Sequence, residues 1–562
     1  MNLKLYTLPG NSLDLPHLAV PQLVGYLKKY YSNVQQKDFN LDVIDYMLRK
    51  EYLEKVFIDL KNDTRIDKDQ LIAYEDIVVN HLDWAKNYIN NELVYDRKEY
   101  ILASKVIQIA LKVISFKYNY YWDFKQIRPK FFADTIESNI NISKSNVNNI
   151  FKDIFENEIV DIIDNEIDIV TVSITYEWQF IHALYFARML KEKSEKVKII
   201  IGGSFISHFS FELRKLINEK CIDAVVLYQG EEVIKFLIEY WTEKDKSKLD
   251  TIKIEYEIDD RFIVYSNSHE AMREIPDFSE LDLKKYLSNK TILPILSSSN
   301  CSYGKCCFCS HFHSYGNAKN HFNLARIMET MKIYKSEYEV DVIYFVDECI
   351  DFDHIISISE MMINNRFDIL WMVETRADVK YNDKSAINIL LESGCCFISF
   401  GLETTSDRVL NDMNKGFASK DAIECINSFK DSKILVATTL MIGFPTETIE
   451  ESSNTLNSIF SELEIDYFGV SIYALLKHSI MDFNREKYFE EVESTDELIL
   501  SYRFKVLDKA YDRNEFKKLL DKFKIKTSIK RHFLLIDNII GRTHLTLFKD
   551  EQASFKKSRC YS

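Results

Sequence analysis

The stretch SSSNCSYGKCCFC, residues 297–309, holds four of the ten cysteines of this chain. It follows an apolar run, Ile292–Leu296, that is typical of a buried strand. Three of the cysteines have the spacing Cys301-x4-Cys306-x2-Cys309. Three thiolates on a loop that leaves a strand can bind three irons of a [4Fe–4S] cluster and leave the fourth iron open to a small molecule.

Two other interpretations fit the same cysteines. Three cysteines with His311 or His313 would form a structural zinc site, since Cys3His is a common zinc ligand set. The grouping could also be accidental in a reduced protein. Cys307 is expected to be a bystander, because adjacent thiolates rarely bind one cluster together, although an exchange with Cys306 stays open.

Composition narrows the function classes. The formal net charge of −15 over 562 residues argues against nucleic acid as the main partner, which would need a basic surface. No apolar run is long enough to predict a membrane span. The N-terminus, MNLKLYTLPG, lacks the pattern of a signal peptide, and cysteines without secretion signals predict a reducing, cytoplasmic setting.

Residues 1–248 are expected to form a first α/β domain. Strands at 3–8 and 33–39 with a helix at 16–29 make a β-α-β opening. Residues 41–165 repeat apolar positions at three- and four-residue steps, which predicts a helical insertion.

Buried parallel strands are predicted at 167–175, 197–203 and 221–228, where the runs are almost continuously apolar. Helices between them imply a doubly wound sheet, which binds ligands outside the carboxyl ends of its strands. The polar or small residues at these ends are Ser173, Thr175, Gly202, Gly203, Gln229 and Gly230. The glycine pair alone would also suit a tight turn. No G-x-G-x-x-G follows the first strand, which disfavours a nicotinamide cofactor.

The rest of the chain divides into three further regions. A hairpin and linker are expected at 249–290 and a mainly helical region at 481–562. That last region is expected to hold helices at 496–511 and 514–523 and a short strand at 544–548. Between them, residues 291–480 alternate strand and helix as a partial (β/α)6 barrel. Its six parallel strands are predicted at 292–296, 340–347, 368–375, 397–403, 434–444 and 466–475.

Polar side chains follow neighbouring barrel strands. Any one of them alone would be explained as a polar residue whose hydrogen bonds are satisfied within the protein. Together they place acids and an arginine at the carboxyl end of the predicted barrel. These residues are chiefly Asp347, Glu348, Glu374, Arg376 and Glu403. An arginine can bind a carboxylate with a forked geometry, and carboxylates accept from an ammonium or from ribose hydroxyls. An amino acid joined to a ribose describes S-adenosylmethionine (SAM).

Residues 292–476 resemble a radical SAM domain. The resemblance rests on the cysteine loop and on YFVDE (344–348), ETRAD (374–378), GLETTSDRVLNDMNKG (401–416) and MIGFPTET (441–448). It implies that Cys301, Cys306 and Cys309 bind the cluster and that SAM chelates the open iron. It further implies SAM contacts from Asp347, Glu348, Arg376, Glu403 and the backbone of Gly443. The common spacing of the family is C-x3-C-x2-C, so this chain has one extra residue in the first gap.

Residues 167–241 resemble the cobalamin-binding domain that precedes many radical SAM domains. The likeness is carried by the glycine pair, by QGEE at 229–232 and by PHLAVPQLVGYL at 16–27. The D-x-H-x-x-G motif of many cobalamin enzymes is missing, as it often is in the resembling family. The likeness implies that Ser173, Thr175, Gly202, Gly203, Gln229 and Gly230 contact cobalamin.

The resemblance implies a cobalamin-dependent radical SAM enzyme that methylates an unactivated carbon of a peptide or small natural product. An electron donor such as flavodoxin or ferredoxin is the implied partner. Cobalamin-independent radical chemistry (rearrangement, cross-linking or oxidation) is the first alternative. A zinc-stabilised binding protein is the second.

Overall fold

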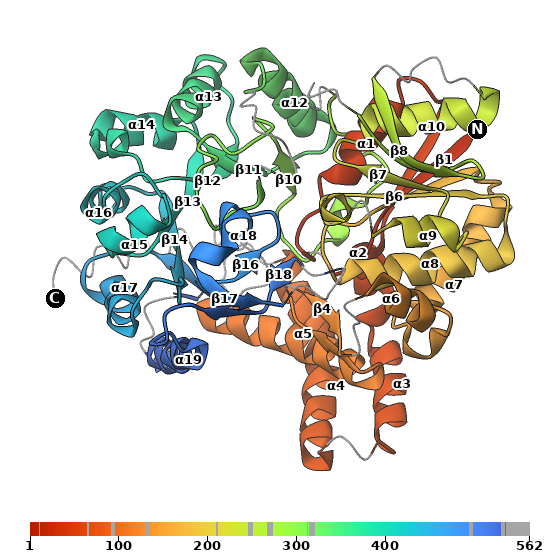
Figure 1. Ribbon diagram of the computed structural model, residues 1–562, viewed down its shortest axis with the longest axis horizontal. Coiled ribbons are helices and arrows are strands. Elements are labelled where there is room, and N and C mark those ends of the chain that lie inside the picture. Colours follow the sequence, from red (N-terminus) through yellow and green to blue (C-terminus); the bar gives the residue numbers. More distant parts are fainter. Residues whose placement is uncertain are drawn as a thin grey trace. The chain divides into compact units, whose positions relative to one another are not determined.

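The computed structural model describes residues 1–10, 12–63, 67–91, 96–124, 126–130, 135–209, 212–244, 251–266, 274–311, 313, 321–493, 498, 500–529 and 534–535 (Figure 1). The chain forms two compact units. The first comprises Met1–Lys290 with Thr495–Ile499, and the second Thr291–Ser494 with Leu500–Ser562. No helix among the described residues has both the length and the apolar character needed to cross a membrane.

The first unit is built on a sheet with the strand order β2-β1-β5-β6-β7-β9-β8. All neighbours pair in parallel except β8 and β9, which form a hairpin. The strands are β1 (Asn2–Thr7), β2 (Asn33–Asp38), β5 (Ile169–Ser173), β6 (Lys198–Gly202), β7 (Ala224–Leu227), β8 (Ile252–Ile258) and β9 (Arg261–Ser266). The doubly wound sheet predicted from the apolar runs is therefore confirmed, and the hairpin extends it, because β9 pairs with β7.

Helices cover both faces of this sheet. On one face, α1 (Ala19–Leu27) and α10 (Glu231–Glu243) share a buried apolar core with the strands. On the other, α8 (Gln179–Lys193) packs Phe186 against Tyr6 of β1, with ring centroids 5.2 Å apart. Continuous burial along β5 and β7 follows from this two-sided cover.

The residues between β2 and β5 are mostly helical. They form α2 (Phe39–Asp42), η1 (Val43–Met47), α3 (Lys50–Leu60), α4 (Lys68–Asn91), α5 (Arg97–Lys117), α6 (Ile136–Ser143), η2 (Asn146–Asn148) and α7 (Lys152–Asp164). A short hairpin of β3 (Tyr120–Trp122) and β4 (Ile127–Pro129) interrupts them, which the helical periodicity did not indicate. In Figure 1, α3, α4 and α5 extend away from the sheet of their own unit.

The second unit is a curved parallel sheet in chain order, β10-β11-β12-β13-β14-β15-β20. Its strands are β10 (Ile292–Ile295), β11 (Val342–Ile350), β12 (Leu370–Thr375), β13 (Cys395–Glu403), β14 (Leu435–Ile442), β15 (Tyr467–Ile472) and β20 (Leu534–Leu535). The main connecting helices are α12 (Leu324–Glu337), α13 (Phe352–Asn364), α14 (Lys384–Glu392), α15 (Asp407–Asp412), α16 (Ser419–Asn427) and α17 (Ile449–Ser461), on the outside of the sheet (Figure 1). The predicted six β/α strands are confirmed, and β20 is added beside β15.

The C-terminal region is only partly as predicted. The helix expected at 514–523 exists as α19 (Arg513–Ile529), preceded by the short α18 (Ile480–Phe483). The prediction of a helix at 496–511 is wrong, because two short strands lie there. The first, β18 (Ser501–Tyr502), pairs with β16 (Leu475–Leu476), and the second, β19 (Phe504–Val506), pairs with β17 (Phe489–Val492). Tyr502, Phe504 and Val506 alternate with polar residues and join one apolar cluster, which is the period of a strand. The strand predicted at 544–548 lies outside the described residues.

Candidate functional site

The cysteine loop begins after β10 and carries the three predicted cluster ligands. The side chains of Cys301, Cys306 and Cys309 are partly buried, and the charges of the first two both act on the third. The amide of Gly304 donates to the Cys301 Sγ at 3.4 Å, in a turn where Gly304 has a φ of 63°. Three partly buried thiols on one loop, one of them accepting from a backbone amide, are a ligand set of the kind that binds an iron–sulfur cluster.

The three thiols differ in acidity. A hydrogen bond from the Cys349 thiol, helped by the amides of Gly304 and Tyr303, lowers the pKa of Cys301 to about 5. Burial raises the pKa of Cys306 and raises that of Cys309 to about 12. Cys301 is therefore the thiol that most readily presents a thiolate to a metal.

Cys307 points away from this group. Its thiol donates to the Asp412 carbonyl at 3.3 Å, its amide donates to the Met413 carbonyl at 3.0 Å, and its carbonyl accepts from the Met481 amide at 3.0 Å. Its side chain packs in an apolar cluster, and burial raises its pKa to about 12. These contacts support the expectation that Cys307 is a bystander.

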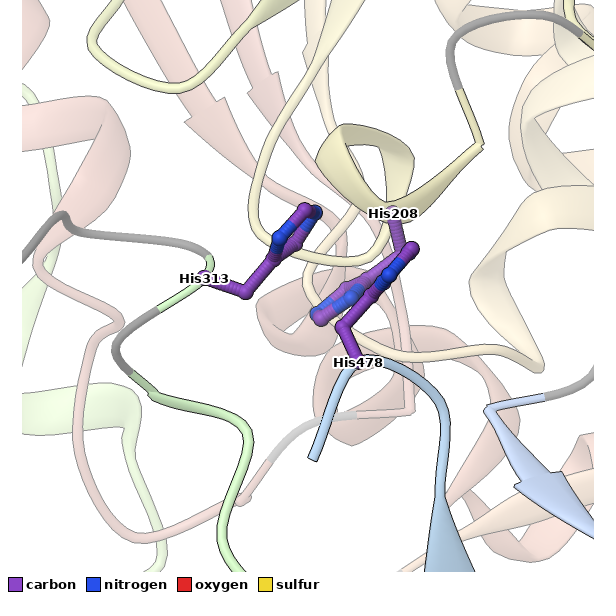
Figure 2. Close-up of side chains that lie close together, drawn as sticks. All are labelled: His208, His313 and His478. Carbon is purple, nitrogen blue, oxygen red and sulfur yellow. The ribbon is translucent and has the colours of Figure 1, made fainter. Parts of the chain in front are cut away.

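Neither histidine near the loop completes a Cys3His set here. His311 pairs with Glu348, with 2.9 Å between Nε2 and Oε2. Burial lowers the pKa of His311, but the hydrogen bond and charge of Glu348 outweigh it and leave the pKa raised. His313 stacks on His478, with ring centroids 3.8 Å apart (Figure 2).

Asp347 holds the start of the loop. Its carboxylate accepts from the amide of Ser297 at 2.9 Å and from the hydroxyl of Ser298 at 2.6 Å. Burial raises the pKa of Asp347 to about 6, and the side chain is 4% exposed. Asp347 therefore anchors the start of the loop, and its contact with SAM stays a prediction. Glu348, which is 41% exposed, is the acid of this pair that reaches the surface.

Arg376 lies beside the cysteines, as expected of a residue at the end of β12. Its guanidinium carbon is 3.5 Å from the centroid of the Tyr303 ring, and Nη1 is 4.0 Å from the Sγ of Cys306. Its Nη2 donates to the carbonyl of Lys415. The Lys415 ammonium in turn pairs with Glu403 at 3.2 Å, and both side chains are mostly buried. The structure therefore brings Arg376 and Glu403 together through Lys415, which the sequence did not single out.

Gly443 follows the end of β14, and its backbone is fully engaged. Its amide donates to Glu447 Oε2 at 2.6 Å, and its carbonyl accepts from the Tyr511 hydroxyl at 2.8 Å. Its φ of 73° suits glycine. Burial raises the pKa of Glu447 to about 7. Glu447 lies within the MIGFPTET motif and could have been found there, whereas nothing in the sequence pointed to Tyr511.

A cavity of about 440 Å³ opens next to the cysteine loop. Ser302, Tyr303, Cys349, Arg376 and Phe417 are among the residues that line it. This volume lies within the range of small-molecule pockets.

In the first unit, the predicted cobalamin residues meet at one edge of the sheet. Taken without the hairpin, the strand order is that of a doubly wound 2-1-3-4-5 sheet, whose switch point lies between β1 and β5. Gln179 joins the two strand ends there: its Oε1 accepts from the Thr175 amide at 2.8 Å and its Nε2 donates to the Leu8 carbonyl at 3.1 Å.

The neighbouring strand ends are linked in the same way. Gly203 has a φ of 114°, and a Cβ there would overlap the carbonyl of Ile174. The Ser207 hydroxyl donates to the Gly203 carbonyl at 3.1 Å and accepts from the Tyr228 amide at 2.7 Å. The sheet edge thus carries Ser173, Thr175, Gly202, Gly203, Gln229 and Gly230, the last at the start of α10. These residues lie along the carboxyl edge of the sheet, where doubly wound sheets bind their ligands.

Two family models match the chain. Residues 295–459 match the radical SAM superfamily, and residues 138–237 match the B12 binding domain. The first match contains the cysteine loop with Arg376, Glu403 and Gly443. The second contains the strand ends at 173–175, 202–203 and 229–230.

Curated relatives match at lower coverage. An uncharacterized methyltransferase of Pyrococcus horikoshii is 26% identical over 57% of this chain and 72% of its own length. The anaerobic magnesium-protoporphyrin IX monomethyl ester cyclase of Rubrivivax gelatinosus is 22% identical over 48% of this chain. The chain spans half the length of that cyclase.

Solved structures share the fold. The radical SAM methyltransferase TsrM of Kitasatospora setae, with cobalamin and a [4Fe–4S] cluster bound, aligns over 100% of both chains with a TM-score of 0.58 and 11% identity. The cobalamin-dependent radical SAM enzyme OxsB aligns over 94% of this chain and 71% of its own, with a TM-score of 0.58 and 12% identity. The chain therefore combines a region that matches the radical SAM superfamily with a region that matches the B12 binding domain, in a fold that it shares with TsrM and OxsB.

Proposed function

We propose that this protein is a cobalamin-dependent radical SAM methyltransferase acting on an unactivated carbon of a peptide or small natural product. The observation that carries the proposal is the placement of Cys301, Cys306 and Cys309, all partly buried, on the loop after β10 inside the region that matches the radical SAM model. The substrate class is supported by one neighbour of similar fold, a TsrM structure described with a tryptophan substrate.

The cofactors would supply the difficult chemistry. When bound, a [4Fe–4S] cluster supplies the electron that cleaves SAM to a 5′-deoxyadenosyl radical, and cobalamin supplies a methyl carrier. The electron would come from a donor protein of flavodoxin or ferredoxin type. The residues of this chain bind, orient and shield these groups.

Cys301, Cys306 and Cys309 would hold the cluster, with Asp347 fixing the start of their loop. Arg376 is the candidate for the SAM carboxylate, since its guanidinium lies against the Tyr303 ring beside Cys306. Glu403 would accept from ribose hydroxyls while Lys415 neutralises its charge.

Glu348 and Gly443 are the two other proposed SAM contacts. Glu348 remains the candidate partner of the SAM ammonium, because it is the exposed acid at the end of β11. The turn at Gly443 would lie against the adenine. It would not donate or accept hydrogen bonds there, since the Gly443 amide and carbonyl are already hydrogen bonded to Glu447 and Tyr511.

In the first unit, Ser173, Thr175, Gly202, Gly203, Gln229 and Gly230 would contact cobalamin. The glycines let these strand ends pack closely, since a Cβ at Gly203 would overlap the carbonyl of Ile174 and a Cβ at Gly202 would lie 3.0 Å from the carbonyl of Val226. The bonds of Gln179 hold the two strand ends of the switch point at a fixed spacing.

The test is anaerobic purification after expression with cobalamin, followed by iron, cobalt and zinc analysis and an assay for SAM cleavage. About four irons per chain with one cobalt are expected. Replacing Cys301, Cys306 or Cys309 by alanine should abolish SAM cleavage, and Cys307→Ala is the matched control that should keep it. Iron without cobalt would favour cobalamin-independent radical chemistry, and zinc without iron would favour the binding-protein alternative.

A further inference from the structure

The β3–β4 hairpin of the helical insertion brings an exposed arginine to the switch point of the first sheet. Arg128 lies on β4 between two buried residues, and its side chain is 53% exposed. The preceding residue, Ile127, packs against Gly10, which follows β1, because a Cβ at Gly10 would lie 2.6 Å from the Ile127 Cγ2. The hairpin therefore reaches the carboxyl end of β1, which is one side of the switch point.

A tryptophan links this arginine to the other side of the switch point. Trp178 follows β5, and its indole N–H donates to the Gly10 carbonyl at 3.0 Å. The guanidinium carbon of Arg128 lies 6.0 Å from the centroid of the Trp178 ring. Tyr176 stacks on the same ring, with centroids 4.8 Å apart and 2° between the planes. These contacts place a cation beside the gap between the ends of β1 and β5.

The Arg128 guanidinium has donors to offer a ligand. Among the described residues it forms an ion pair with Glu177, where 3.9 Å between Nη2 and Oε2 is long for such a pair and both side chains are partly exposed. A guanidinium has five N–H donors in a planar fork that matches the oxygens of a phosphate. A cation of this kind at a ligand-binding switch point is suited to a phosphate group.

We propose that Arg128 binds the phosphodiester in the nucleotide tail of cobalamin, so that the helical insertion contributes a subsite to the cofactor site. The inference rests on the proposed function, because it takes cobalamin as the ligand of the first unit. The side chains of the corrin ring are uncharged amides, whereas the tail carries a negative phosphodiester. The strand-end residues proposed to contact cobalamin are all uncharged, and Arg128 supplies the positive charge that they lack.

The experiment compares two corrinoids on the full chain, purified anaerobically from cells grown without cobalamin. Aquocobalamin carries the nucleotide tail, and diaquocobinamide has the same ring without the phosphate, ribose and base. Equilibrium dialysis with corrin absorbance gives the dissociation constant of each corrinoid for the parent, for Arg128→Gln and for a matched control. The control is Arg214→Gln, because the Arg214 guanidinium carbon lies 5.3 Å from the ring centroid of Tyr256 on β8, an edge strand away from the switch point.

Arg128→Gln should weaken cobalamin binding about tenfold, the effect of losing one hydrogen bond to a charged group, and should change cobinamide binding by less than about twofold. Arg214→Gln should leave both dissociation constants at the parent values. The comparison of the two corrinoids isolates the tail, because an effect on the ring site or on the fold would appear with both.

Three results would overturn the inference while leaving the proposed function intact. An equal loss for both corrinoids would assign the effect of Arg128 to the ring or to the fold. Unchanged binding of both would leave Arg128 without a role in cofactor binding. An equal loss of cobalamin binding in Arg214→Gln would assign the effect to general weakening of the first unit. A parent protein that binds neither corrinoid would instead refute the cobalamin part of the proposed function, and the subsite with it.

Discussion

Asp347 on β11 is hydrogen bonded to Ser297, which follows β10. Its carboxylate accepts from both the amide and the hydroxyl of that serine at 2.9 to 3.1 Å. A second serine, Ser298, donates to the same carboxylate at 2.6 Å. The cysteine loop therefore leaves the sheet from a point fixed by a buried acid. A polar group buried with its partners in place positions a loop more tightly than an exposed one.

Asp347→Ala should weaken the hold on the cluster. Loss of the carboxylate leaves the buried amide and hydroxyl of Ser297 without this acceptor, which should cost about 3 kcal/mol of unfolding free energy. Iron retained after gel filtration and denaturant unfolding are the measurements. Asp341→Ala is the matched control, because Asp341 accepts from the Thr291 amide at 2.8 Å at the opposite end of the same strand pair. Equal iron content in the two variants would refute the anchoring role.

Lys415→Met should destabilise the second unit. It leaves the mostly buried carboxylate of Glu403 without its partner at 3.2 Å, a change worth about 3 kcal/mol. SAM binding should weaken as well, because the orientation of Glu403 depends on this pair. Lys420→Met is the control, since Lys420 is 83% exposed and lies 3.8 Å from Glu424, where a pair is worth under about 1 kcal/mol.

A double variant separates charge from packing at this pair. Adding Glu403→Gln to Lys415→Met removes the unpaired charge and should recover part of the lost stability. If the double variant is as unstable as the single one, the loss comes from packing of the lysine stem and the electrostatic argument fails.

Glu447→Gln should change how stability depends on pH. Burial raises the pKa of Glu447 from 4.5 to about 7, so the folded chain binds the proton more tightly than the unfolded chain. Its contribution to stability therefore falls as the pH rises from about 4.5 to about 7, by at most about 3 kcal/mol. Glutamine keeps an oxygen for the Gly443 amide but carries no charge.

The glutamine variant should match the parent in unfolding free energy at pH 5 and exceed it at pH 8. Denaturant unfolding of both proteins at the two pH values measures this, and effects of other groups cancel in the difference. A constant difference between the two proteins across this range would contradict the raised pKa.

The sequence was sufficient for the alternation of strands and helices and for the cysteine loop, because burial on both faces leaves long apolar runs that are easy to find. It was not sufficient for the direction of individual side chains. Asp347 and Glu348 are adjacent in one motif, yet one turns to Ser297 and the other lies at the surface next to His311. Adjacent residues of a strand face opposite sides, and the motif alone does not say which side the ligand occupies.

The sequence also did not predict contacts between segments that are distant along the chain. Tyr511 bonds to the carbonyl of Gly443, and the pairing of β9 with β7 extends the first sheet. Both depend on tertiary placement rather than on local periodicity. The strand at 504–506 has the alternation of a strand. Its three residues were too few to outweigh the helical residues around them.

Gln179→Leu should loosen the switch point of the first sheet. The amide side chain joins the Thr175 and Tyr176 amides to the Leu8 carbonyl, with 2.8, 3.1 and 3.1 Å between the bonded atoms. Leucine fills the volume but leaves the buried Leu8 carbonyl and the part-buried amides of Thr175 and Tyr176 without this partner, at a cost of about 2 kcal/mol. Cobalt bound per chain should fall while iron content stays at the parent value.

Asn2→Ala is the control, because it removes a bond from its Nδ2 to the Glu166 carbonyl (3.0 Å) at the amino edge of the same sheet. If both variants lose cobalt equally, the loss reflects general weakening of the first unit; if only Gln179→Leu does, the carboxyl edge between β1 and β5 is where cobalamin binds.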